Sequence, residues 1–204
     1  MSDIKVKICG LTRTADVRNA VAAGAALLGF VFAPSPRRVT LDQARELLHS
    51  VPSGTTRVGL FMDPPSAEVA RAIDQLPIDC LQFHGSETNE FCRSFGLPFV
   101  KAIGMQGQAD LAAALRAYPD ATALLLDSHA PGERGGTGQA FDWDSVARPG
   151  CAVWLAGGLT PENVAYAISR IRPDVVDVSS GVETRPGVKD HALMTKFVAA
   201  ARNA

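Results

Sequence analysis

The stretch CAVWLAGGLTPENVAYAISRIRPDVVDVSSGVE, residues 151–183, decides the fold. Two short apolar runs at 151–156 and 175–179 have the length and the Val, Leu and Ala content of buried strands. Between them, residues 160–171 begin with a threonine that can cap a helix, a proline at the first helical position and an acid just after it. The order strand, helix, strand is typical of a parallel sheet, so we expect one βαβ unit here.

The same alternation runs through the rest of the chain. Further strands are expected at 5–9, 27–32, 57–62, 80–84, 98–103 and 122–127, and further helices at 40–51, 66–76, 108–118 and about 190–202. Thr40 and Ser66 are the expected N-caps of two of these helices. Eight strand-then-helix units at roughly 25-residue spacing predict an α/β protein, a single-domain (β/α)₈ barrel over residues 1–204. The alternative is a doubly wound open sheet, which would usually carry a GxGxxG turn where this chain has CGLTRT after the first run.

Composition limits the classes of function. The 204 residues are 47% hydrophobic and 20% charged with a net charge of −1, so no global basic field favours nucleic acid or acidic lipid. No apolar run is long enough for a membrane span, and MSDIKVKICG lacks the pattern of a signal peptide. The cysteines at 9, 80, 92 and 151 are too widely spaced for a CxxC or zinc-knuckle motif. We therefore expect a cytoplasmic protein with reduced thiols, no metal, and no nucleic-acid or membrane partner.

Polar residues close two of the predicted strands, at the barrel end where active sites lie. Lys5, Lys7 and Cys9 share a parity, so all three are expected to point into the barrel. Cys9 is a base or nucleophile if its thiolate is accessible, and otherwise a small core residue. Asp127 is a candidate acid or merely a turn starter, and the glycine-rich segment at 132–138 after it is a candidate lid.

The glycine-rich loops after the last two strands predict a phosphate site. Barrels often bind phosphate with these two loops and the N-terminus of a short extra helix, where glycines let backbone N–H groups approach the anion. Ordinary tight turns are the alternative interpretation. The residues expected to hold phosphate are Gly157, Gly158, Ser180 and Gly181.

The loop after the second strand, FAPSPRRVT at 32–40, carries two arginines. Arg37 suits a carboxylate because a guanidinium can form two parallel hydrogen bonds, although Arg37 and Arg38 could also be solvated surface residues. Three further polar residues are expected to face the barrel interior by parity, without a defined role: Gln82, His84 and Lys101.

Together, these segments resemble the phosphoribosylanthranilate isomerase family of tryptophan biosynthesis. The resemblance covers essentially the whole chain in order, in the blocks VKICGLT, GFVFAPSPRRV, VGLFMD, LQFHGSE, LLLDS followed by GGTGQAFDW, LAGGLTPENV and VDVSSGVETRPGVKD. The FAPSPRRV loop is one residue shorter than usual in that family, but its SPR segment still aligns Arg37.

The resemblance implies an Amadori rearrangement of N-(5-phosphoribosyl)anthranilate to 1-(2-carboxyphenylamino)-1-deoxyribulose 5-phosphate, with no metal or organic cofactor. It implies that Asp127 is the acid that opens the ribose ring and Cys9 the base that removes the C2 proton. It further implies that Arg37 binds the anthranilate carboxylate and that the glycine and serine residues named above bind the phosphate. Burial is expected to raise the pKa of Asp127, and Lys7 to favour the Cys9 thiolate. A small phosphorylated substrate is the expected partner of a monomer or weak homodimer.

Other functions stay open at this stage. The related histidine-pathway isomerase has an aspartate as its strand-1 base, where this chain has Cys9. Indole-glycerol-phosphate synthase would need catalytic lysines and a glutamate. A non-catalytic barrel that binds a phosphorylated ligand could keep the glycine loops and lose the acid and base.

Overall fold

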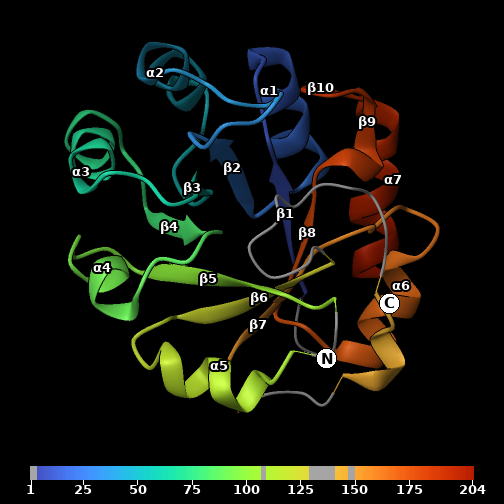
Figure 1. The fold of residues 1–204 in the computed structure, drawn as a ribbon. Coiled ribbons are helices and arrows are strands. Elements are labelled where there is room, and N and C mark those ends of the chain that lie inside the picture. The colour runs from blue at the N-terminus through green and yellow to red at the C-terminus, as the bar shows by residue number, and fades with distance from the viewer. Residues whose placement is uncertain (1–3, 107–108, 129–140, 147–149) are drawn as a thin grey trace.

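Eight parallel strands close into a barrel in the order β1 to β8, with β8 paired to β1, in the computed structural model (Figure 1). The structure describes residues 4–106, 109–128, 141–146 and 150–204. The strands are β1 (Lys5–Cys9), β2 (Leu27–Val31), β3 (Thr56–Phe61), β4 (Cys80–Phe83), β5 (Phe99–Gly104), β6 (Ala123–Asp127), β7 (Val153–Leu155) and β8 (Val175–Val178). The predicted parallel barrel is confirmed, and each strand lies within two residues of its predicted bounds.

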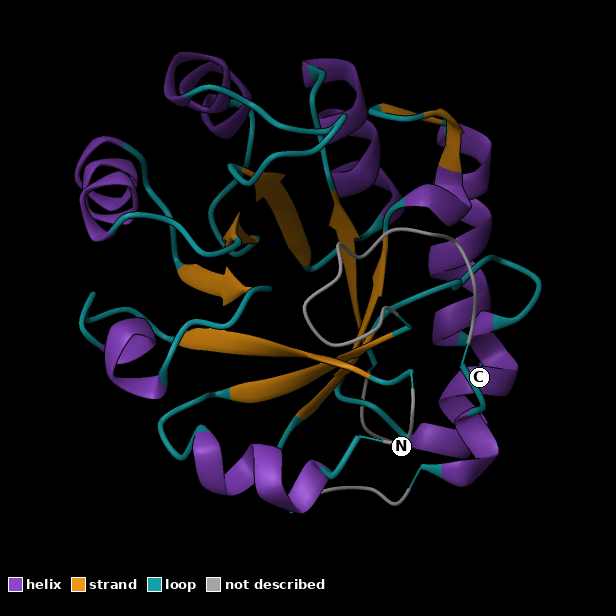
Figure 2. Ribbon diagram, in the orientation of Figure 1, coloured by secondary structure: helices purple, strands orange, loops and turns teal. Residues whose placement is uncertain are grey.

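Helices form the outer layer, around the strands (Figure 2). They are α1 (Thr14–Ala23), α2 (Leu41–His49), α3 (Ser66–Gln75), α4 (Asn89–Arg93), α5 (Leu111–Ala117), α6 (Val164–Ile171) and α7 (His191–Arg202). Between β6 and β7 the described residues hold only the 3₁₀ helix η1 (Trp143–Ser145), so this unit departs from the predicted strand-then-helix pattern. No helix in the described part of the chain has both the length and the hydropathy that a membrane crossing needs.

Two small elements after β8 were not predicted. The 3₁₀ helix η2 (Ser180–Val182) follows the strand directly. An antiparallel ribbon of β9 (Glu183–Arg185) and β10 (Val188–Lys189) then leads into α7. The ribbon lies next to the start of α1, because Thr12 Oγ1 donates a hydrogen bond of 2.5 Å to the carbonyl of Gly187.

Of the three helix starts predicted from a capping residue, one is right and two are wrong. Thr40 caps α2 in a full capping box, in which its hydroxyl accepts from the Gln43 amide and the Gln43 side chain accepts from the Thr40 amide. Ser66 is the first residue of α3 rather than its cap, because Pro65 holds the capping position in an extended conformation. Residues 160–163 form a turn before α6, which begins at Val164 rather than at the predicted residue 160.

The barrel interior is apolar toward the N-terminal ends of the strands and polar toward their C-terminal ends. Its lower part is filled by Leu27, Val58, Cys80, Val100, Ala102, Ala123, Leu125, Trp154, Ala156 and Val175. On β1, Val6 and Ile8 pack in the outer cluster beneath the helices, as predicted, while Lys7 and Cys9 point inward. The mouth therefore lies above a solid core, which fixes the strand ends that carry its side chains.

Lys101 does not point inward, and that prediction is wrong. On β5, Val100 and Ala102 face the interior, so Lys101 faces the helix layer. Its ammonium group donates to the carbonyl of Gly85 and lies 3.3 Å from a carboxylate oxygen of Glu87. Both faces of a strand in a parallel barrel are buried, so the sequence of β5 shows no alternation that separates inside from outside.

Candidate active site

A cavity of about 370 Å³ opens at the C-terminal ends of the barrel strands. One wall is apolar and is formed by Val31, Ala33, Pro34, Leu60 and Met62. The predicted site residues that line the cavity are Cys9, Arg37, Gln82, His84, Asp127, Gly157, Gly158, Ser180 and Gly181. The tertiary structure thus brings together residues predicted from six separate loops or strand ends. Within the described ranges, no group of three or more His, Cys, Asp or Glu side chains is placed to hold a metal ion.

Cys9 ends β1 and lies opposite Gly29 of β2. A Cβ atom on Gly29 would lie 2.7 Å from the Cys9 sulfur and 3.0 Å from Lys7 Nζ, so the missing side chain makes the space that both groups occupy. Burial raises the pKa of the Cys9 thiol, and the Lys7 ammonium opposes this rise. The thiol form is therefore favoured over the thiolate at neutral pH.

Lys7 lies beneath the cavity rather than on its wall. It is fully buried and forms a 2.8 Å ion pair with Asp177 of β8, so its predicted site-lining position is corrected. Burial lowers the pKa of Lys7, but the charges of Asp177 and Cys9 outweigh burial and raise it. Asp177 in turn raises the pKa of Cys9, so the ion pair reduces the help that Lys7 gives the thiolate.

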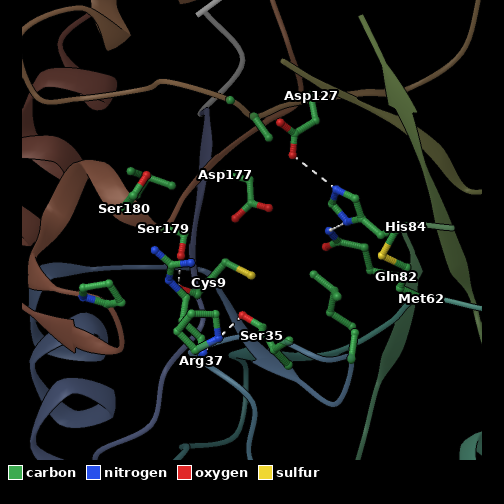
Figure 3. Close-up of a pocket in the computed structure, with 18 of the residues that line it drawn as sticks. Cys9, Ser35, Arg37, Met62, Gln82, His84, Asp127, Asp177, Ser179 and Ser180 are labelled. Atoms are coloured by element: carbon green, nitrogen blue, oxygen red, sulfur yellow. Dashed lines mark hydrogen bonds and ion pairs between the residues drawn. The ribbon is translucent and has the colours of Figure 1, made fainter. Parts of the chain in front are cut away.

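Asp177 was not predicted, although it lines the cavity. Its Oδ2 atom accepts from Lys7, whereas its Oδ1 atom has no hydrogen-bond partner among the described residues. In the view of Figure 3 its carboxylate lies between Cys9 and Asp127. A second acid near the end of β8 is visible in the sequence, but both faces of this strand are buried, so the sequence alone does not show that Asp177 points inward.

Asp127 ends β6 and is contacted by His84 (Figure 3). His84 Nε2 lies 3.2 Å from Asp127 Oδ2, and His84 Nδ1 lies 3.2 Å from the side-chain nitrogen of Gln82. All three side chains are nearly buried. A continuous chain of contacts therefore runs from Gln82 through His84 to the Asp127 carboxyl group.

Arg37 reaches the cavity but is already held by a carboxylate. Its Nε and Nη2 atoms donate bonds of 2.8 and 2.7 Å to the two oxygens of Glu183. Lys189 Nζ lies 2.8 Å from the same carboxylate and 3.0 Å from the carbonyl of Ser179. These bonds outweigh burial and lower the pKa of Glu183, and the bond to Glu183 raises the pKa of Arg37. Burial lowers the pKa of Lys189.

The two glycine-rich loops form the opposite side of the cavity from main-chain atoms. Gly157 and Gly158 have φ values of 80° and 66°, which side-chain-bearing residues rarely adopt. A Cβ on Gly157 would overlap Ser128, and one on Gly181 would overlap the carbonyl oxygen of Leu159. At both positions the main chain therefore lies too close to its neighbour to leave room for a side chain.

Some predictions fall outside the described residues, and some residues were missed. The candidate lid at 132–138 lies outside them. Gly29 and Glu183 were missed, and they contact Cys9 and Arg37 from other elements. Lys189 was also missed, and it contacts Glu183 and Ser179. Each carried a weak sequence signal at most, because its partner is known only once the barrel has closed.

The chain is similar in sequence and in structure to known proteins of one family. The family described as PRAI, N-(5'phosphoribosyl)anthranilate (PRA) isomerase, matches residues 6–200. The N-(5'-phosphoribosyl)anthranilate isomerase of Pseudomonas fluorescens (strain Pf0-1) is 48% identical over 207 residues, which cover 99% of this chain and all of that protein. The crystal structure of phosphoribosyl anthranilate isomerase from Thermotoga maritima is 37% identical, with a TM-score of 0.89 and coverage of 98% of this chain and 100% of that one. A crystal structure of this isomerase in complex with reduced 1-(o-carboxyphenylamino)-1-deoxyribulose 5-phosphate is 34% identical, with a TM-score of 0.85 and the same coverage.

Proposed function

The chain belongs to the N-(5'-phosphoribosyl)anthranilate isomerase family, and we propose that it converts N-(5-phosphoribosyl)anthranilate to 1-(2-carboxyphenylamino)-1-deoxyribulose 5-phosphate. The observation that carries the proposal is a single cavity that holds an acid, a thiol, an arginine and two glycine loops. The reaction is an Amadori rearrangement of an aminoaldose to an aminoketose in tryptophan biosynthesis.

Asp127 is the proposed general acid. It gives a proton to the ring oxygen of the ribose as the bond between that oxygen and C1 breaks, which leaves a protonated Schiff base between C1 and the anthranilate nitrogen. The buried position of Asp127 and its contact with His84 support this role, because they hold one carboxyl oxygen in a defined direction.

Cys9 is the proposed general base. The positive Schiff base acidifies the proton on C2, the thiolate removes it, and the electron pair neutralises the nitrogen to give an enolamine. Ketonisation then places a carbonyl at C2 and completes the isomerisation. A cation that develops beside Cys9 stabilises its thiolate, which compensates for the burial that favours the thiol.

The two ends of the substrate have separate proposed anchors. The backbone amides around Gly157, Gly158, Ser180 and Gly181 bind the phosphate, and Arg37 binds the anthranilate carboxylate. The aromatic ring lies against the apolar wall formed by Val31, Leu60 and Met62. This orientation leaves the reacting carbons between Cys9 and Asp127.

Purified protein tests the proposal directly. We expect it to consume N-(5-phosphoribosyl)anthranilate, followed as a loss of the fluorescence of this substrate, faster than a Cys9→Ser variant that is equally folded. Absence of turnover above the spontaneous decay of the substrate would reject the proposed reaction.

The proposal extends to the setting of the enzyme. The phosphorylated substrate is its small-molecule partner, and the cytoplasm its location, supported by four cysteines that are all free. We propose that the barrel works as a monomer or weak homodimer, which light scattering over a range of protein concentrations measures.

A further inference from the structure

We propose that Glu183 is a positioning residue that selects substrates with an aryl carboxylate, because it holds one edge of the Arg37 guanidinium and turns the other edge to the cavity. This inference rests on the proposed function, in which Arg37 binds the anthranilate carboxylate. It adds a residue and a cause of selectivity to that function.

The hydrogen bonds define which edge of Arg37 is free. A guanidinium can offer a carboxylate two parallel N–H groups from its Nε and one Nη atom, or from its two Nη atoms. Glu183 takes the first edge, at 2.8 Å from Nε and 2.7 Å from Nη2. Nη1 and the second hydrogen of Nη2 remain, and they form the edge at the end of the side chain. A substrate carboxylate must therefore approach Arg37 end-on.

Glu183 is itself fixed from the opposite side. Its side chain is 4% exposed, and Lys189 Nζ donates to it at 2.8 Å, with the amide of Gly187 at 3.2 Å. Lys189 is tied in turn to Ser179, whose hydroxyl donates to the carbonyl of Cys9. The carboxylate is therefore held by the β9–β10 ribbon, and it stays in place when an anion approaches Arg37.

The charges of this cluster favour an anionic ligand. Arg37 and Lys189 carry two positive charges against one negative charge on Glu183, so the cluster keeps a net positive charge at the cavity wall. Without Lys189, Glu183 would neutralise Arg37 and leave no net attraction for a carboxylate. The lysine thus allows a glutamate to orient the arginine without cancelling its charge.

Close packing fixes the rest of the Arg37 side chain. A Cβ on Gly10 would lie 2.5 Å from Arg37 Cδ, so the arginine lies directly on the backbone that follows β1. The amide of Arg37 also donates to the hydroxyl of Ser35. The guanidinium is therefore held beside Cys9 before substrate binds, which lowers the conformational entropy lost on binding.

A pair of substrates separates orientation of Arg37 from general damage. One is N-(5-phosphoribosyl)anthranilate and the other is N-(5-phosphoribosyl)aniline, which lacks the carboxylate. For Glu183→Gln we expect KM for the first to rise about fivefold to tenfold, since Arg37 must then be ordered on binding. The KM for the aniline compound and both kcat values should change less than about twofold. In an Arg37→Ala background, Glu183→Gln should have no further effect on KM.

Thr12→Val is the matched control, since it removes the bond between Thr12 and Gly187 that ties the ribbon to the start of α1 and leaves the Arg37–Glu183 pair intact. It should leave the ratio of the two KM values unchanged. An equal rise in both KM values, the same change in Thr12→Val, or a fall in KM for the anthranilate compound would overturn the proposal. A fall would mean that Glu183 competes with the substrate.

Calorimetry separates this inference from the proposed function. Unreactive reduced amine analogues of the two products, with and without the carboxylate, report the same selection as a ratio of Kd values without turnover. A wild-type protein that fails to turn over either substrate would reject the proposed function. A ratio of Kd values that Glu183→Gln leaves unchanged would reject the positioning role of Glu183.

Discussion

The two sides of the cavity are built from different parts of the polypeptide. The side after β7 and β8 is main chain, shaped by glycines at positive φ or in contact with neighbouring carbonyls. The side formed by β1, β6 and the loop after β2 is made of charged and polar side chains, each paired with a side chain from another element: Lys7 with Asp177, Asp127 with His84, and Arg37 with Glu183. A phosphate needs many weak donors that any glycine-rich turn can provide, whereas a directed proton transfer needs one group at one place.

The difference predicts opposite sensitivities to mutation. Removing atoms should damage the side-chain half, because each function there depends on one group. Adding atoms should damage the main-chain half, because its shape depends on absent side chains. Four further experiments test this contrast.

The largest effect is expected from the proposed acid and base. Cys9→Ser and Asp127→Asn should each lower kcat by about 10² to 10⁴-fold, the usual contribution of a positioned acid or base, with KM little changed. Steady-state kinetics of the purified variants measures this. A kcat near that of the wild type in either variant would remove that residue from the proposed mechanism.

Arg37→Ala tests the other side-chain anchor. We expect KM to rise about tenfold to a hundredfold, because charge-assisted hydrogen bonds to the carboxylate are lost, with a smaller effect on kcat. The same kinetic assay measures both constants. A collapsed kcat at unchanged KM would contradict a carboxylate-binding role.

Gly157→Ala tests the main-chain half by adding one methyl group. The new Cβ would overlap Ser128, and we expect about a tenfold rise in KM, in line with the cost of overpacking. Gly54→Ala is the matched control, because Gly54 also has a positive φ, of 91°, but its Cβ would meet no atom within 4 Å. If both variants raised KM equally, the overlap with Ser128 would not explain the change.

The smallest effect is expected from Lys7→Met and appears in the pH profile. The Lys7 ammonium lowers the pKa of Cys9 against burial, so its removal should raise that pKa further and move the alkaline rise of kcat/KM to higher pH. Alkylation of Cys9 by iodoacetamide at several pH values, read by peptide mass spectrometry, measures the thiol directly. Lys5→Met, on the same strand but at its exposed end, should leave the profile unchanged.

An equal pKa of Cys9 in Lys7→Met and in the wild type would show that Lys7 does not lower the pKa of this thiol. Because Lys7→Met also leaves Asp177 without its partner, the folded fraction must be checked by thermal unfolding. A double variant with Asp177→Asn removes that unpaired charge.

The sequence by itself determined the strands, their order along the chain and which residues of each strand share a face. Short apolar runs separated by turn residues identify parallel strands. The two-residue period of a strand places Lys7 and Cys9 on the same face of β1, and Gln82 and His84 on the same face of β4. Glycines after two successive strands mark the loops on the main-chain side of the cavity in the sequence itself. These features are local, so a local pattern is enough to find them.

Only the tertiary structure decided which distant groups meet. Glu183 reaches Arg37 across 146 residues and Asp177 reaches Lys7 across 170, and both contacts depend on the register at which the barrel closes. Parity states which residues of one strand share a face, but not which face is inside when both are buried, and Lys101 was misplaced for this reason. The charge that each site residue experiences is therefore set by closure of the barrel, which no single segment of the sequence encodes.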